Sequence, residues 1–224
     1  MCGRYTLTIP EQLALRFDAA EDRRDEAEQL RPAYNIAPSQ AIPVVVERAE
    51  GRALRSMLWG FRPTWASAGS TRPAPINARA ETLLERPLFR GAIAHGRCII
   101  PADGFYEWQG VPGRTAKQPI YIRRKDRAIF GFAGLYSVTR DGTASCAIVT
   151  TKPNALVAPI HDRMPVILAA DVEDLWLDPT LIDPASGLEC LQPCAADLLD
   201  AYPVSPRVSS PRYDEPSLTE PLTA

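Results

Sequence analysis

Two apolar segments joined by a glycine-containing turn constrain the fold more than any other feature of this sequence. The first, residues 42–47, contains three consecutive valines, whose β-branched side chains favour extended backbone. The second, residues 53–59, follows the turn dipeptide Glu50-Gly51. The pattern predicts a β-hairpin of two antiparallel strands.

The rest of the chain alternates short extended segments with short helical ones. Further strands are expected at residues 2–8, 97–101, 119–123, 128–136 and 145–151, helices at 10–17, 87–95, 171–177 and 194–199, and a turn at 34–38. Because neither a repeat nor a linker divides the chain, we expect one α+β domain over residues 1–224. Its sheet should be curved, mainly antiparallel and barrel-like, flanked by short helices. From about residue 203, frequent prolines predict an irregular tail.

Charge is unevenly distributed along the chain. The whole sequence carries a formal net charge of −2, yet residues 52–127 contain fourteen Lys/Arg and five Asp/Glu. A basic block in an acidic protein indicates an anionic partner at one surface. No apolar run is long enough to cross a membrane and no apolar signal segment follows Met1, so we expect no membrane association.

Five cysteines at irregular spacings and two histidines limit redox and metal chemistry. The odd number of cysteines favours reduced thiols in a cytosolic compartment. In the absence of a CxxC pair, neither a metal site nor another cofactor is expected. The sequence also lacks P-loop, GxSxG and HExxH patterns, so an ATP-driven or zinc-protease reaction has no support.

Removal of Met1 would make Cys2 an unusual reagent. We expect this removal because the residue after Met1 has a small side chain. The product is a cysteine with a free α-amine beside its thiol. The pKa is about 7.7–8 for such an amine and about 8.5 for such a thiol. This 1,2-aminothiol condenses with an aldehyde to an imine, and the thiol then closes a five-membered thiazolidine. The alternative is that Cys2 is an ordinary small residue at a frayed terminus.

Three further places in the sequence could carry chemistry. Glu107 lies among aromatic residues, where burial favours a neutral carboxyl able to transfer protons near neutrality, although an outward-facing strand residue fits equally. His161 could act as an acid or base, or serve a structural role. Asn77 and Arg79 share one face of an extended segment. There they could orient a substrate and hold a phosphate, or be ordinary loop residues.

An aromatic and basic run at residues 59–65 resembles the stacking surfaces of single-strand nucleic-acid binders. It holds Trp59 and Trp65, with Arg62 between them. Tryptophans in strands and turns are also common core residues, so both interpretations stay open at this point.

A set of motifs, in order over residues 2–168, resembles the SOS-response-associated peptidase (SRAP) family. The motifs are Cys2-Gly3-Arg4-Tyr5, Tyr34-Asn35-Ile36-Ala37-Pro38, Trp59-Gly60, Pro63-x-Trp65, Ile76-Asn77-Ala78-Arg79-x-Glu81-Thr82, the segment 97–108, Gln118-Pro119, Phe132-Ala133-Gly134-Leu135 and His161-Asp162-Arg163-Met164-Pro165. The tail departs from the pattern, since Val208-Ser209 stands where the family tends to have Val-Asn.

The resemblance implies a function in the DNA damage or SOS response. The protein would bind single-stranded DNA containing an abasic site, whose ring-opened sugar presents an aldehyde, and cross-link to it through a Cys2 thiazolidine. This lyase-like activity would either protect or process the lesion, and a cysteine-type peptidase activity of the protein itself could remove Met1. The expected location is the cytoplasm, on the nucleoid when DNA is bound, and the expected state is a monomer.

The same resemblance implies roles for individual residues. Asn77 would position the sugar or the Cys2 amine, and Glu107 and His161 would move protons. The implied DNA-binding residues are Arg4, Pro38, Trp65, Arg79, Trp108 and Arg163, of which Arg79 and Arg163 would hold phosphates.

Two functions of other classes stay open. One is an amidohydrolase or peptidase that uses Cys2 as nucleophile with His161 and Glu107. The other is a non-covalent single-strand binding module in which Cys2 is incidental.

Overall fold

A computed structural model of the chain describes residues 2–21, 30–66, 74–181 and 183–222, and it contains the predicted hairpin. Strand β4 (Ala41–Arg48) pairs antiparallel with β5 (Gly51–Trp59), with Arg48 opposite Gly51. The φ angle of Gly51 is +108°, a conformation that side-chain-bearing residues rarely adopt, so a glycine is required where the chain reverses. Met1 lies outside the described residues.

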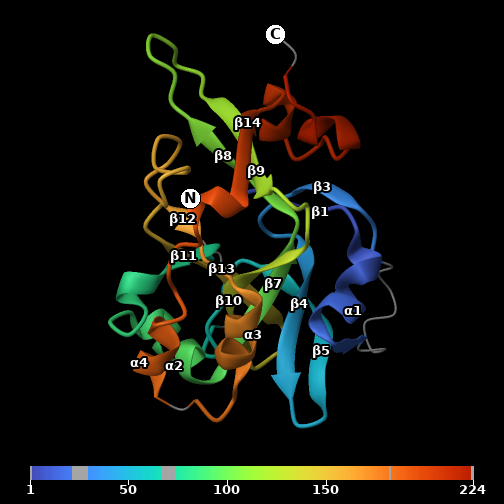
Figure 1. Ribbon diagram of the computed structural model, residues 1–224. Coiled ribbons are helices and arrows are strands. Elements are labelled where there is room, and N and C mark those ends of the chain that lie inside the picture. The colour runs from blue at the N-terminus through green and yellow to red at the C-terminus, as the bar shows by residue number, and fades with distance from the viewer. Residues whose placement is uncertain (1, 22–29, 67–73, 182, 223–224) are drawn as a thin grey trace.

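The hairpin belongs to a closed ring of five strands, the barrel in the lower half of Figure 1. Strand β4 pairs with β7 (Arg97–Ala102), β7 with β10 (Phe130–Val138), and β10 with β11 (Ala144–Thr151), all antiparallel. A parallel pairing of β11 with β5, with Ser145 opposite Leu58, closes the ring. The expected curved, mainly antiparallel, barrel-like sheet is confirmed.

Four short strands extend this ring: β2 (Ala19–Glu21), β6 (Asn77–Arg79), β12 (Met164–Pro165) and β13 (Ile167–Leu168). Strand β6 runs parallel to β11, and β12 runs antiparallel to the end of β11. The barrel therefore brings β6 and β12 to one strand, β11, from far apart in the sequence.

A second sheet stands at one end of the barrel and contains the N-terminal strand. Its order is β14-β9-β8-β1-β3. Strand β1 (Tyr5–Leu7) lies between β3 (Ala33–Ile36) and β8 (Gly104–Gln109), antiparallel to both. Strands β9 (Gln118–Arg124) and β14 (Leu199–Pro203) complete the sheet. Figure 1 shows the β8–β9 hairpin rising above the barrel beside the C-terminal segment.

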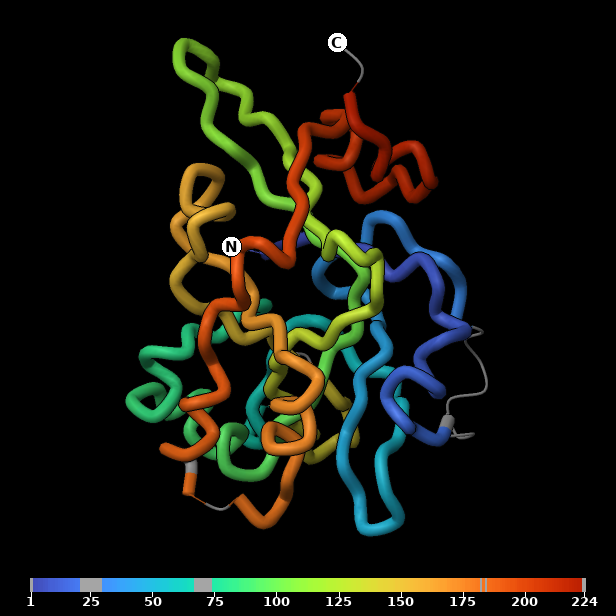
Figure 2. The backbone as a smooth tube through the Cα atoms, in the orientation of Figure 1, coloured from blue at the N-terminus to red at the C-terminus, as the bar shows by residue number. Residues whose placement is uncertain are grey.

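The helices are short and lie around the barrel (Figures 1 and 2). The α-helices are α1 (Leu13–Phe17), α2 (Pro87–His95), α3 (Ala170–Leu177) and α4 (Pro184–Leu188). The 3-10 turns are η1 (Pro10–Gln12), η3 (Ala80–Thr82), η4 (Ala196–Leu198), η5 (Pro206–Ser209) and η6 (Pro216–Thr219). None of the helices in the described segments is long and apolar enough to span a membrane.

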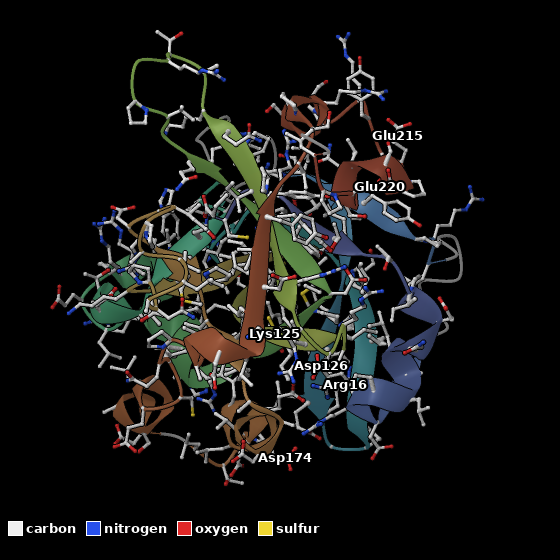
Figure 3. The ribbon with its side chains drawn as sticks, turned by 45° about the horizontal axis from the view of Figure 1, so that its top comes forward. Arg16, Lys125, Asp126, Asp174, Glu215 and Glu220 are labelled. Carbon is white, nitrogen blue, oxygen red and sulfur yellow. The ribbon has the colours of Figure 1, made fainter. Side chains whose placement is uncertain are left out.

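An ion pair joins helix α1 to helix α3. Arg16 of α1 donates to both carboxylate oxygens of Glu173 on α3, at 2.9 and 2.7 Å, and to the Ile129 carbonyl at 3.1 Å. Arg16 is labelled in Figure 3. Because Glu173 is 2% exposed, this pair is a buried link rather than a surface contact.

Two local predictions are wrong, and several strands were not predicted, β8 among them. Residues 194–199 form only the 3-10 turn η4 before β14 begins at Leu199, because the following residues pair with β9. Residues 33–36 are strand β3 rather than part of a turn, because they pair with β1. Strand β8, which had no strand assignment, is held between β1 and β9. In each case long-range pairing outweighs local propensity.

The N-terminal strand also contributes to the barrel core. The Tyr5 ring is fully buried and packs edge-on against Trp59 and Phe132, with centroid distances of 5.3 and 6.0 Å. Aromatic pairs in this geometry are worth about 0.5–1.5 kcal/mol beyond their area. Tyr5 therefore ties the second sheet to the barrel next to the end of the chain that carries Cys2.

The C-terminal segment packs on the second sheet. Val204, Val208 and Leu218 are fully buried and form a small cluster with Tyr106 of β8 and Tyr121 of β9. Figure 3 shows this segment, with Glu215 and Glu220 labelled, lying across the top of the sheet. The cluster is separate from the barrel core.

A buried carboxylate fastens β1 to the start of β8. Asp103 Oδ1 accepts from Thr6 Oγ1 at 2.5 Å, and Asp103 Oδ2 accepts from the Thr8 backbone nitrogen and Oγ1 at 2.5 and 2.6 Å. Asp103 is 6% exposed and Thr6 is 0% exposed, so water competes little for these bonds.

We expect Asp103→Asn to lower the free energy of unfolding by about 3 kcal/mol. The amide offers one acceptor oxygen where the carboxylate offers two, so the donors of Thr6 or of Thr8 lose their acceptor, and hydrogen bonds to a charged group are worth about 1.5–3 kcal/mol each. Urea denaturation measures the effect, with the exposed Asp197→Asn as the control. An unchanged urea midpoint for Asp103→Asn would contradict this account of β1.

Candidate active site

Cys2 lies three residues before β1, in a buried position at the junction of the two sheets. Cys2 is 0% exposed. Asn77 Nδ2, at the start of β6, donates to the Cys2 carbonyl at 2.9 Å, and Cys2 Sγ lies 3.8 Å from the Arg4 carbonyl. The Cys2 backbone is therefore fixed by a side chain that reaches it from the barrel.

Glu107 lies on β8, across from the residues that follow Cys2. Tyr5 pairs with Phe105, and the Tyr106 amide donates to the Arg4 carbonyl at 3.0 Å. Continuing this antiparallel register brings Gly3 level with Glu107. The site is thus positioned by the pairing of β1 with β8.

Burial raises the pKa of Glu107 to about 7. The side chain is 2% exposed, so its charged form has lost most of its contact with water. A carboxyl with a pKa near the working pH can both release and accept a proton, as general acid–base catalysis requires.

The same buried surroundings change the pKa of the Cys2 thiol. Burial raises its pKa well above the usual range, and the negative charge of Glu107 adds to the effect. Cys2 is therefore a neutral thiol at neutral pH. The electrostatic influence of Glu107 on the sulfur also shows that the two groups share one environment.

His161 faces Glu107 from the segment that joins β11 to β12. Its Nε2 lies 3.9 Å from Glu107 Oε2, and its Nδ1 accepts a hydrogen bond from the Arg163 amide at 3.0 Å. A ring nitrogen that accepts a hydrogen bond carries no hydrogen of its own, so the neutral ring holds its proton on Nε2, toward Glu107. The backbone of Arg163 thus selects the tautomer.

Burial lowers the pKa of His161, so the ring is mainly neutral at neutral pH. Lys117, immediately before β9, lowers this pKa further, whereas Asp162 raises it. Asp162 Oδ1 lies 2.9 Å from Nδ1 and becomes a hydrogen-bond partner only when that nitrogen is protonated. The site therefore contains one acid and one base whose ordinary charges are both suppressed.

Asn77 has a second polar atom at the site. Its Oδ1 is buried and accepts no hydrogen bond from the residues that the structure describes. A buried acceptor without a donor costs free energy, on the order of 1–3 kcal/mol. This oxygen is suited to accept a hydrogen from a group that arrives with the substrate or from a processed amine.

The four residues predicted to be catalytic are therefore brought together from four separate parts of the chain. Asn77 donates a hydrogen bond to the Cys2 carbonyl, the charge of Glu107 raises the pKa of the Cys2 thiol, and His161 faces Glu107. Within the described ranges, no group of three or more His, Cys, Asp or Glu side chains could hold a metal ion.

Two of the predicted DNA-binding residues are engaged with the C-terminal segment. Arg4 donates to the Val208 carbonyl at 2.7 Å, to the Ser209 carbonyl at 3.4 Å and to Asn35 Oδ1 at 3.2 Å. Trp108 donates from its indole Nε1 to Ser209 Oγ at 3.0 Å. The serine that departs from the family's Val-Asn pattern thus contacts the aromatic residue next to Glu107.

Three other predicted DNA-binding residues lie outside the buried cluster. Pro38 lies in the turn after β3, Trp65 is 62% exposed, and Arg79 is exposed at the end of β6. Arg79 makes no ion pair with the described residues. An exposed indole and an exposed guanidinium are available to a ligand, and Arg79 lies only two residues from Asn77.

Arg163, in contrast, is largely buried and already paired. It forms a two-point ion pair with Glu81 of η3, with distances of 2.7 and 2.8 Å, and donates to the Thr150 carbonyl at 2.6 Å. Its side chain is 11% exposed. Glu81 and Lys117 were not predicted as site residues, although Glu81 lies in the same sequence motif as Asn77 and Arg79.

The fold and the site define an α+β barrel protein with a buried cysteine just before its N-terminal strand, beside a carboxyl, an imidazole and an amide. The family model described as "SOS response associated peptidase (SRAP)" matches residues 1–211. The chain belongs to this family.

Several known proteins are similar to this chain. "Abasic site processing protein YoqW" of Bacillus subtilis is 43% identical over 225 residues, which cover 98% of this chain and 99% of that protein. "Abasic site processing protein HMCES" of Mus musculus is 26% identical, over 99% of this chain and 76% of that protein. A crystal structure of a Bacteroides thetaiotaomicron protein, 28% identical, superposes with a TM-score of 0.87 and covers 99% of this chain and 100% of its own.

The raised pKa of Glu107 predicts a pH-dependent contribution to stability. Between about pH 4.3, the ordinary pKa of glutamate, and about pH 7, the unfolded state loses its proton first, so the free energy of unfolding falls as pH rises. Glu107→Gln removes this loss and should be more stable than wild type at pH 8 by on the order of 3 kcal/mol, but not at pH 4.

Urea denaturation of both proteins from pH 4 to 8 measures the difference, with the exposed Glu11→Gln as the control. A wild-type-minus-variant difference that does not change over this range would show that Glu107 has an ordinary pKa.

Proposed function

We propose that this protein captures the aldehyde of an abasic site in single-stranded DNA as a covalent thiazolidine on Cys2, after removal of Met1. The names of the relatives support the choice of an abasic site as the target, since YoqW and HMCES are both called abasic site processing proteins. The observation that carries the chemistry is the assembly of Cys2, Asn77, Glu107 and His161 at one buried point.

The reaction balances without a cofactor. While Met1 is attached, the Cys2 nitrogen is an amide and cannot form an imine. After its removal, the free amine adds to the sugar aldehyde and water leaves, which gives a C=N bond. The thiol then adds across this bond: sulfur joins the carbon, and the nitrogen ends with one hydrogen.

Both steps need proton transfers that the neighbouring groups can supply. Loss of water from the first adduct needs an acid, and the protonated form of Glu107 is suited to this role. Ring closure needs a base for the Cys2 thiol, whose raised pKa keeps it protonated until then. His161, with its proton on Nε2 toward Glu107, is placed to assist opening of the sugar ring and to relay protons to the carboxyl.

Asn77 fits the role of a positioning residue. One end of its amide already fixes the Cys2 carbonyl, and the other end presents a buried acceptor. That acceptor can bind an N–H of the processed amine or a hydroxyl of the sugar. Either contact would hold the nucleophile and the electrophile together, which is where much of the rate of such condensations comes from.

The exposed residues around the site suit a single strand. Arg79 can contact a phosphate near the lesion, and Trp65 can stack on a base. Pro38 and Trp108 would pack against the strand on either side. Because the four catalytic groups come from one chain, the proposal needs only a monomer, located wherever its DNA is.

The raised pKa of the thiol argues against hydrolysis by a cysteine nucleophile. Such enzymes lower the pKa of their cysteine so that the thiolate attacks. In this chain both burial and Glu107 act in the opposite direction. An amine-first reaction is compatible with a neutral thiol, whereas a thiolate-first reaction is not.

We expect the processed protein to form a denaturation-resistant adduct with single-stranded DNA that contains one abasic site. Cys2→Ala should form no stable adduct but bind the strand with an affinity within about twofold of wild type, because the phosphate contacts remain. Intact-mass spectrometry and denaturing gels measure both, with an undamaged strand as the control. Absence of an adduct from processed wild type would refute the proposal.

Glu107→Gln separates two routes for the removal of Met1. If the site itself cleaves Met1, the variant keeps the methionine, because the amide cannot act as a general base. If a cellular aminopeptidase does so, the variant loses it like wild type. Intact mass of the purified proteins distinguishes the routes. We expect loss of Met1 in both, since burial keeps the thiol neutral.

A further inference from the structure

Helix α2 carries two exposed arginines for which the proposed function has so far given no role. Arg86 is the residue immediately before the helix, and Arg90 lies four residues later on it. Neither side chain forms an ion pair or a hydrogen bond with a residue that the structure describes. Positions four apart are neighbours on a helix surface. We call Arg86 and Arg90 together the α2 basic face.

Two cations at this place are unfavourable for the helix itself. Like charges four residues apart repel, and the N-terminal end of a helix carries the positive end of its dipole. The first turn of α2 contains no acidic residue. Glu85, which precedes Arg86, is exposed and forms no ion pair with either arginine. The two charges therefore lower the stability of α2 slightly, and an anionic ligand would reverse this effect.

The α2 basic face continues from the candidate site along a compact stretch of chain. Strand β6 ends at Arg79, and η3 and a further turn lead directly to α2. The Leu83 amide donates to the Ala80 carbonyl at 3.4 Å, and the Arg86 amide donates to the Thr82 carbonyl at 3.0 Å. At a rise of about 1.5–2.0 Å per residue, Arg86 lies within about 14 Å of Arg79, and Arg90 lies about 6 Å beyond it.

This spacing suits the backbone of a single strand. A stacked strand presents one phosphate about every 3.4 Å, so the stretch from Arg79 to Arg90 matches about five nucleotides. Figure 1 shows α2 at the end of the barrel away from the β8–β9 hairpin. A strand that follows these arginines would therefore run from the site along the side of the barrel.

An exposed aromatic residue comes from a loop that packs on the same helix. Phe89, between the two arginines in sequence, is buried against Phe61 with a centroid distance of 5.1 Å. Trp65 follows Phe61 by four residues and is 62% exposed, in a turn that the Ala66 amide closes by donating to the Pro63 carbonyl at 2.8 Å. Proteins that bind single strands combine such an aromatic surface with nearby cations.

We propose that Arg86 and Arg90 form, together with Trp65, a second contact surface for single-stranded DNA, which binds backbone phosphates on one side of the lesion at Cys2. A guanidinium binds phosphate oxygens in pairs, and phosphate contacts carry no sequence information. The contact is therefore independent of base sequence. The proposal rests on the proposed function for the presence of a lesion at Cys2, but binding of an undamaged strand tests it separately.

The first test is the double variant Arg86→Gln/Arg90→Gln, titrated with an undamaged single strand at several salt concentrations. Each phosphate contact contributes about 0.7 to the slope of log K against log salt, so the slope should become smaller by about 1.4. At about 0.1 M salt, affinity should fall on the order of tenfold. The matched control, Lys125→Gln/Arg127→Gln, removes the same charge from the exposed turn between β9 and β10 and should change affinity less than twofold.

A second variant changes the charge in the opposite direction. Glu85→Gln removes the acidic side chain next to Arg86, so it should strengthen binding of the same strand about twofold. Urea denaturation of the double variant checks the fold, and its midpoint should not fall, since both arginines are exposed and repel each other.

The position of the contact can be tested with strands that extend from an abasic site on one side only. Cys2→Ala, which should form no stable adduct, allows equilibrium affinities to be measured. Extension toward α2 should tighten binding by this protein, and Arg86→Gln/Arg90→Gln in the same background should lose that gain. The gain from extension on the other side should remain.

Three results would overturn the proposal. They are an unchanged salt slope in the double variant, an equal loss of affinity in the Lys125→Gln/Arg127→Gln control, and an equal loss for extensions on both sides of the lesion. If processed wild type binds the undamaged strand but forms no cross-link with an abasic one, only the proposed function fails. The salt slopes then still decide whether α2 contacts the strand.

Discussion

Strand β1 has only three residues, and the candidate site depends on the hydrogen bonds that fix it. Its backbone pairs with β3 and β8, the Asp103 carboxylate binds Thr6 and Thr8, and the Tyr5 ring is enclosed by aromatic side chains of the barrel. A chain terminus usually frays, because nothing beyond it restrains its dihedral angles. Here the strand that follows the terminus lies in the middle of a sheet, and Cys2, three residues before it, is as fully buried as a core residue.

Burial of the candidate site also determines the protonation states of its side chains. Removal of water raises the pKa of Glu107 and of the Cys2 thiol and lowers that of His161, so all three groups are shifted toward their neutral forms. Neutral groups can exchange protons in sequence without creating isolated buried charges. In the proposed function, the charged residues that would face a nucleic acid lie outside this buried site, and Arg79 at the end of β6 is exposed.

Much of the fold could be predicted from local sequence patterns. The valine-rich hairpin and the helix at residues 87–95 were found because their signals are local, and the family motifs identified Cys2, Asn77, Glu107 and His161 before any geometry was known. The strand at 199–203 and the ion pair of Arg163 could not be predicted in this way. Both depend on partners far away in the sequence, β9 in one case and Glu81 in the other. A charged residue in a motif does not reveal whether its partner is a ligand or another side chain.

The seam between β5 and β11 has a consequence for how the molecule folds. It joins Leu58 to Ser145 and Trp59 to Cys146, residues that local structure cannot bring together, and the loop entropy of such contacts makes their formation slow. Strand β6 docks on β11 as well, so the amide that grips Cys2 gains its place only after β11 has formed. A collapsed intermediate could therefore have an intact hairpin and most of its helices and still be chemically inert. In the proposed function, reactivity at Cys2 would therefore appear only after β11 and β6 have paired.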